Sequence, residues 1–80
     1  MKTVRVQYFA LLREQRGLSQ ETLTTTMTDA ATLYAELGAR HGFSLPLEHL
    51  RAAINGDFVP WPAPLKDGDE VVFIPPVAGG

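Results

Sequence analysis

One segment in the middle of the chain constrains the fold most, because it carries the strongest helix pattern in 80 residues. Four apolar side chains recur there at the i, i+3, i+4, i+7 spacing of a helix face, and they are Ala30, Leu33, Tyr34 and Leu37. Thr28 or Asp29 is the expected N-cap, and Gly42 is the expected C′ residue that ends the helix. A chain with one such helix has to bury the apolar face of that helix against strands.

The remaining segments alternate between strand patterns and turn signals. Strands are predicted for residues 3–9, 19–27, 50–55, 58–59 and 70–74. The side chains expected to point into the core are Val4, Val6, Tyr8, Leu50, Ala52, Ile54, Val71 and Phe73. The threonine-rich segment 19–27 is expected to pair back on the first strand as an edge.

Shorter signals complete the predicted chain path. Residues 10–16 favour a short helical turn that ends at Gly17, and Asn55-Gly56 predicts a tight turn before the short return strand. Three alternate prolines at positions 60, 62 and 64 exclude a central strand and indicate an extended edge segment. Trp61, which lies among these prolines, is expected to cover one edge of the core.

This order of elements predicts an α+β roll, with one main helix laid across a mixed sheet of four to five strands. The first and last strands are expected to lie parallel at the centre of the sheet, which is how a β-grasp (ubiquitin-like) fold is built. We expect residues 1–75 to form this domain and residues 76–80 to form a flexible C-terminal Gly-Gly tail.

Composition excludes several functions. The 7 basic and 9 acidic residues give a net charge of -2, which argues against nucleic acid or an anionic membrane as the main partner. The chain has no cysteine, so a disulfide framework, a cysteine-based metal site and a thiol nucleophile are excluded. No signal-peptide pattern follows Lys2, and a cytoplasmic location is expected. So short a chain has little volume for an enclosed active site, and a module that works on a partner protein is the expected class.

The C-terminus carries the most functional information. Pro75 and Pro76 follow the last strand directly, and their fixed φ angles project the chain away from the body. Beyond them the side chains shrink from Val77 through Ala78 to Gly79 and Gly80, giving an arm that reaches roughly 20 Å from Pro75 when extended. Such an arm fits a narrow channel and delivers the α-carboxylate of Gly80, which ATP-dependent adenylation would activate.

Three motifs in this sequence resemble one family. They are Phe9-Ala10 with Arg13-Glu14, then residues 65–71 (LKDGDEV), and above all residues 75–80 (PPVAGG). Together they are similar to the small subunit of molybdopterin synthase, the MoaD family of ubiquitin-like sulfur carriers. The resemblance covers essentially the whole chain.

The resemblance implies a function and its partners. An E1-like adenylyltransferase would convert Gly80 to an acyl-adenylate, and a sulfur donor would convert that to a thiocarboxylate. The tail, with Gly79 and Gly80 at its end, would then donate sulfur to cyclic pyranopterin monophosphate inside the large synthase subunit, in a heterotetramer of two small and two large subunits. The catalytic side chains would belong to the large subunit, so this chain is not an enzyme on its own. It would bind no cofactor and no metal, and ATP would be used by the activating enzyme.

The outer face of the sheet is the candidate docking surface. Phe9, Val72 and Ile74 fall opposite to the core side chains, and Phe58 is expected to join them. The alternative is that a loop or short helix covers these residues. In the family this face contacts both the large subunit and the activating enzyme, which favours an interface made by residues Phe9, Phe58, Val72, Ile74, Pro75, Pro76, Val77 and Ala78.

Other readings stay open at this stage. The chain could be a sulfur carrier for another pathway, of the thiamine thiazole type, or a ubiquitin-like protein modifier, or an interaction module with a passive tail. His41 and His49 are expected to be surface residues rather than metal ligands. Residues 67–70 (DGDE) indicate a solvated turn whose acidic groups are available to partners, and Arg13 and Glu14 indicate a loop ion pair at most.

Overall fold

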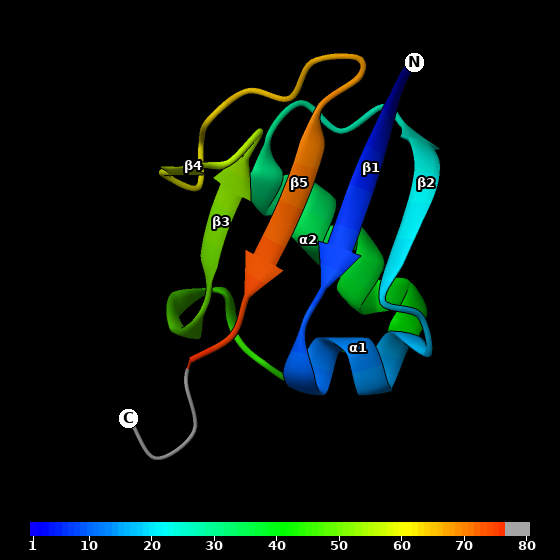
Figure 1. Cartoon of the computed structure of the whole chain (residues 1–80), viewed down its shortest axis with the longest axis vertical. Helices are drawn as coiled ribbons and strands as arrows, with labels where there is room; N and C mark the ends of the chain where they lie inside the picture. Colours follow the sequence, from blue (N-terminus) through cyan, green and yellow to red (C-terminus); the bar gives the residue numbers. More distant parts are fainter. Residues whose placement is uncertain (77–80) are drawn as a thin grey trace.

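The sheet has five strands in the order β2-β1-β5-β3-β4 (Figure 1). The computed structural model describes residues 1–76 of the chain. Its strands are β1 (Lys2–Tyr8), β2 (Gln20–Thr25), β3 (Arg51–Ile54), β4 (Asp57–Val59) and β5 (Glu70–Ile74). Strands β1 and β5 run parallel at the centre, and the other neighbouring strands pair antiparallel. The predicted α+β roll of the β-grasp type is therefore confirmed.

The main helix, α2 (Ala30–His41), lies across one face of the sheet (Figure 1). Of the two N-cap candidates, Asp29 is the cap. Its side chain accepts a hydrogen bond from the backbone N–H of Thr32, and the Thr32 hydroxyl oxygen accepts one from the backbone N–H of Asp29. Two donors at the helix start are thus satisfied within one capping box. Gly42 ends the helix with φ at 72°, a conformation that favours glycine.

The core lies between α2 and the sheet. Its largest fully buried side chains are Val4, Val6, Tyr8, Leu12, Leu33, Leu37, Val71 and Phe73. The predicted inward-facing positions are confirmed in β1 and β5, where alternate residues are buried. Trp61 covers the edge of this core as expected, because its ring stacks on Phe73 with 6.1 Å between ring centroids.

Two shorter helices complete the fold. Helix α1 (Ala10–Arg16) confirms the predicted helical turn, buries Leu12 and ends at Gly17, whose φ is 83°. A 3₁₀ turn, η1 (Leu47–His49), leads into β3. None of the helices within residues 1–76 is long and apolar enough to cross a membrane.

The proline-rich segment differs from the sequence prediction. The predicted extended edge segment over the three prolines is instead a turn, in which the backbone N–H of Ala63 donates to the carbonyl of Pro60. The carbonyl of Ala63 then accepts from Ala30, and an isolated bridge joins Pro64 to Asp29. The prolines cannot donate to a neighbouring strand, so the segment packs against the start of α2.

The acidic turn of residues 67–70 also differs from the prediction of a solvated turn. Asp69 is 8% exposed and is not part of a solvated surface. Its carboxylate accepts from the backbone N–H of Lys66 at 2.8 Å and from the amide of Asn55 at 2.9 Å. The amide oxygen of Asn55 in turn accepts from the backbone N–H of Glu70. These bonds tie the turn before β5 to the turn between β3 and β4, because each buried polar atom requires a partner.

Candidate functional site

The face of the sheet opposite α2 is left uncovered by the helices of the described chain (Figure 1). We call the apolar side chains Phe9, Phe58, Val72 and Ile74 on this side the open face. Phe58 is 65% exposed and Phe9 is 41% exposed, while Val72 and Ile74 are half-buried. Within residues 1–76, the alternative in which a loop or helix covers this face is thus excluded for Phe9 and Phe58, whose rings are exposed. Phe9 and Phe58 lie at opposite sides of this face, with β5 and β3 between their strands, and exposed apolar side chains spread over one face in this way are typical of a docking surface.

Strand register places these residues, which come from three separate segments, on one face of the sheet. Ala53 pairs with Phe58 on one side and with Val72 on the other. Phe9 follows Tyr8 in an extended conformation, directly after the point where Tyr8 pairs with Phe73 of β5. Phe9 and Ile74 are therefore the next residues along two parallel neighbouring strands, on the same face.

Two arginines lie on the same side of the sheet. Arg51 pairs in register with Ile74, and its guanidinium carbon lies 5.8 Å from the ring centroid of Phe58, a cation–π distance. Arg5 forms an ion pair with Glu70, with 3.0 Å between Nη1 and Oε2. The open face is thus an apolar surface that carries one arginine against an aromatic ring and one paired arginine at its edge.

The root of the C-terminal tail adjoins the open face. Pro75 is buried and Pro76 is exposed, so Pro75 offers less free surface than the other predicted interface residues within residues 1–76. A groove of about 290 Å³ runs beside these prolines. It is lined by Glu48, His49, Leu50, Arg51, Ile74, Pro75 and Pro76. The predicted site residues Val77, Ala78, Gly79 and Gly80 lie outside the described residues.

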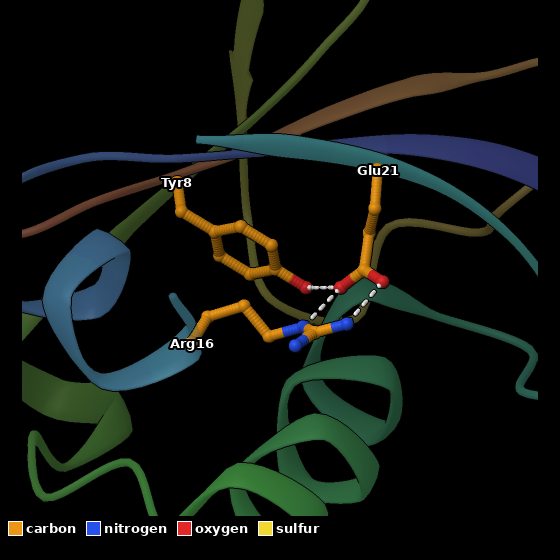
Figure 2. A network of polar contacts seen from close by, with 3 residues as sticks. All are labelled: Tyr8, Arg16 and Glu21. Carbon is orange, nitrogen blue, oxygen red and sulfur yellow. Dashed lines mark hydrogen bonds and ion pairs between the residues drawn. The ribbon is translucent and has the colours of Figure 1, made fainter. Parts of the chain in front are cut away.

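A polar network that the sequence analysis missed joins α1 to the sheet (Figure 2). The Glu21 carboxylate accepts from Nε and Nη2 of Arg16, both at 2.8 Å, and from the Tyr8 hydroxyl at 2.6 Å. Hydrogen bonds from Arg16, with a smaller contribution from Tyr8, lower the pKa of Glu21 to about 2, although burial opposes this. Burial and the bond to Glu21 raise the pKa of Tyr8, so its hydroxyl stays a donor. The network holds α1 in place beside Phe9.

The other candidate residues hold no site. His49 is exposed and His41 is half-buried, and residues 1–76 contain no group of three or more His, Asp or Glu side chains placed to hold a metal ion. The ion pairs of this part of the chain are Arg5–Glu70 and Arg16–Glu21, so the ion pair considered for Arg13 and Glu14 is not formed and both side chains are exposed. What the described geometry supports is protein docking at the open face.

Comparison with known proteins gives one family match. The family model described as the ThiS family matches residues 6–80. Among curated proteins, the molybdopterin synthase sulfur carrier subunit of Escherichia coli is 36% identical, over 96% of this chain and 99% of that protein. The subunit of the same name from Haemophilus influenzae is 33% identical, over 94% and 96%.

Solved structures share the fold along the whole chain. A Pyrococcus furiosus structure assigned as molybdopterin converting factor, subunit 1, is 31% identical, with a TM-score of 0.78 and coverage of 96% of this chain and 100% of that one. A complex of subunits 1 and 2 of molybdopterin-converting factor from Helicobacter pylori is matched with 28% identity, a TM-score of 0.68 and coverage of 98% and 99%. Small archaeal modifier protein 1 from Methanosarcina acetivorans is 26% identical, with a TM-score of 0.78 and coverage of 100% and 98%.

Proposed function

The chain belongs to the ThiS family, and from that premise we propose that it acts as the sulfur carrier subunit of molybdopterin synthase. The observation that carries this function is the name shared by both curated relatives, which align with nearly the full length of this chain. The resemblance to the MoaD family that the sequence motifs predicted is thereby confirmed. The terminal Gly79-Gly80 supplies the carboxylate that a carrier of this kind needs.

The proposed chemistry takes place at the α-carboxylate of Gly80. A carboxylate does not react with sulfur nucleophiles at neutral pH, because oxide is a poor leaving group. An E1-like adenylyltransferase would let a carboxylate oxygen attack the α-phosphorus of ATP, with release of pyrophosphate. Hydrosulfide would then attack the carbonyl carbon of the acyl-adenylate, and AMP would leave. The product is a thiocarboxylate at Gly80, formed without any cysteine in this chain.

The proposed acceptor is cyclic pyranopterin monophosphate, bound in the large synthase subunit. The dithiolene product contains two sulfur atoms, so two charged carriers are consumed for each product. Catalytic side chains would come from the large subunit, while this chain supplies the sulfur and a docking surface. A large-subunit partner agrees with the Helicobacter pylori complex of subunits 1 and 2. We propose two small and two large subunits in the assembly, and a cytoplasmic location because activation consumes ATP.

The open face is the proposed contact surface for the large subunit. It lies at the same end of the sheet at which β5 passes into Pro75 and Pro76, since Ile74 is the last residue of β5. A partner seated on Phe9, Phe58 and Ile74 would therefore lie next to the point where the tail leaves the domain. This arrangement fixes the tail's starting point relative to the partner's active site, which lowers the entropic cost of delivering Gly80.

A second candidate is a ubiquitin-like protein modifier. The observation that favours it is the likeness to small archaeal modifier protein 1 from Methanosarcina acetivorans. Both functions begin with adenylation of the terminal glycine, and they differ in what attacks the activated carbonyl. A lysine amine on another protein would give an isopeptide bond, whereas a sulfur nucleophile gives the thiocarboxylate. Covalent adducts on other proteins, found after expression of tagged carrier, would identify the modifier function.

The test is the intact mass of the protein after incubation with ATP, a sulfide source and the candidate activating enzyme. We expect a mass gain equal to one oxygen replaced by one sulfur, located at Gly80 by fragmentation. A variant lacking Gly80 serves as the control, and we expect it to unfold at the wild-type temperature but to gain no sulfur. If wild-type protein forms neither the acyl-adenylate nor the thiocarboxylate, the sulfur carrier function is refuted.

A further inference from the structure

Arg51 stands out on the open face because it is an exposed cation set among apolar side chains. It pairs in register with Ile74 on β5, and its guanidinium lies over the ring of Phe58 at 5.8 Å. The ring holds the guanidinium against the surface of the sheet instead of letting it extend into water. This contact, worth about 0.5–1 kcal/mol at an exposed site, favours a conformation of Arg51 close to the sheet before any partner arrives, which lowers the entropy lost on binding.

The hydrogen-bond donors of Arg51 remain available. In the described chain, the arginine side chains that donate to a protein oxygen are Arg5 and Arg16, which bind Glu70 and Glu21. Arg51 shares the outer side of the sheet with Arg5, but within residues 1–76 it has no counterpart of Glu70. A guanidinium carries five N–H donors in a planar fork that matches a carboxylate.

Docking changes the energetics of this cation. A protein that covers Phe58 and Ile74 also takes the guanidinium of Arg51 out of water. Removing a cation from water without a compensating acceptor is costly, whereas a paired and hydrogen-bonded cation is tolerated. We infer that Arg51 receives a carboxylate from the protein that docks on the open face, and that it thereby selects this partner against apolar surfaces of similar shape.

The groove beside Arg51 offers space for that carboxylate. Its volume is about 290 Å³, and Leu50, Ile74 and Pro75 contribute apolar surface to its lining. Glu48 also lines it, yet the ion pairs within residues 1–76 do not include a pair between Glu48 and Arg51. A short acidic side chain from the partner can thus approach the guanidinium, although the Glu48 carboxylate in the lining repels it.

This inference rests on the proposed function, because it takes the docking protein to be the large synthase subunit. The experiment measures the dissociation constant of that subunit for the full-length carrier at low and high salt. We expect Arg51→Gln to bind about tenfold more weakly or worse, and Arg51→Glu to bind more weakly again, because it places two carboxylates in contact. The weakening should shrink at high salt, which screens a partly exposed ion pair.

Two variants serve as controls. Arg40→Gln removes the same charge from an exposed position on α2, on the opposite layer, and should bind within about threefold of wild type. Glu48→Gln should bind as tightly as wild type or more tightly. Thermal unfolding of each free variant confirms that the domain is intact.

Three results would overturn the inference. They are Arg51→Gln binding as tightly as wild type, Arg51→Glu binding as tightly as Arg51→Gln, and Glu48→Gln weakening binding as much as Arg51→Gln. If the wild-type carrier gains sulfur and the variants give any of these results, only the role of Arg51 is refuted. Wild-type carrier that neither gains sulfur nor binds the large subunit refutes the proposed function, and the role of Arg51 with it.

Discussion

The carboxylate of Glu21 makes a measurable prediction about stability at acidic pH. It accepts two hydrogen bonds from Arg16 and one from Tyr8, and these bonds lower its pKa from the usual value near 4.5 to about 2. Arg16 contributes most, while burial acts in the opposite direction. A carboxylate that is more acidic in the folded state than in the unfolded state stabilises the fold when it is ionised.

The size of the effect follows from the two pKa values. Moving from 4.5 to about 2 is equivalent to about 3 kcal/mol, at 1.36 kcal/mol for each pKa unit. The side chains of Arg16 and Glu21 remain 24% and 16% exposed, so water screens part of this interaction. We therefore expect a net contribution of about 1–2 kcal/mol to the free energy of unfolding.

The pH window follows from the direction of the shift. Above pH 4.5 the carboxylate is ionised in both states, and the stabilisation is complete. As the pH falls from about 4.5 towards about 2, the unfolded state takes up a proton first, and the stabilisation is lost. The assay is urea unfolding of wild type and Glu21→Gln across this range. Wild type should lose about 1–2 kcal/mol more than the variant, which has no charge to titrate at this position.

A neighbouring substitution provides the control. Thr22 is exposed on the outer side of the same strand, so Thr22→Ala tests the effect of altering β2 without touching the network. It should show the pH dependence of wild type. If Glu21→Gln also shows that dependence, the Arg16–Glu21 pair does not stabilise the fold and the reasoning from its geometry is refuted.

Three further predictions concern the docking face, the acidic turn and the helix cap. Ile74→Asp should weaken binding of the large subunit while the free domain unfolds close to the wild-type temperature. A large drop in that temperature would place Ile74 in the core. Asp69→Ala should cost about 2 kcal/mol in urea unfolding, because the buried carboxylate that accepts from the backbone N–H of Lys66 and the amide of Asn55 is removed, whereas a similar loss for the exposed Asp57→Ala would contradict this. Asp29→Ala should cost about 1 kcal/mol by removing the α2 cap. Thr28→Ala is its control, and an equal loss there would reassign the cap.

The elements that the sequence predicted well are those whose signal is local. The face of α2 and the alternate residues of β1 and β5 follow from the repeat distances of a helix and a strand, and all of them are buried as expected. The tight turn at Asn55-Gly56 also follows locally: Asn55 has φ at 53° and Gly56 has φ at 90°, which these two residue types tolerate best.

The features that the sequence did not predict depend on contacts between distant segments. Asp69 looks like any acidic turn residue until the fold brings Asn55, fourteen positions earlier, to its carboxylate. Glu21 likewise gains part of its role from Tyr8, which lies on the neighbouring strand, although Arg16, five positions earlier, contributes most. A signal existed for the second case, since strand pairing of 19–27 with 3–9 was predicted and places these residues near one another. Identifying Tyr8 as the hydrogen-bond partner of Glu21 still required the register in which the two strands pair.

The open face sets a limit on how tightly each partner of the proposed carrier can bind. Activation and sulfur transfer both use Gly80, so one carrier cannot occupy both active sites at once. If the activating enzyme and the large subunit both dock on Phe9, Phe58 and Ile74, each complex has to dissociate before the other forms. An apolar surface with one cation suits this requirement: the apolar side chains provide affinity for either partner, while Arg51 discriminates between surfaces by a single ion pair. A larger and wholly apolar face would bind more tightly and would slow the exchange on which turnover depends.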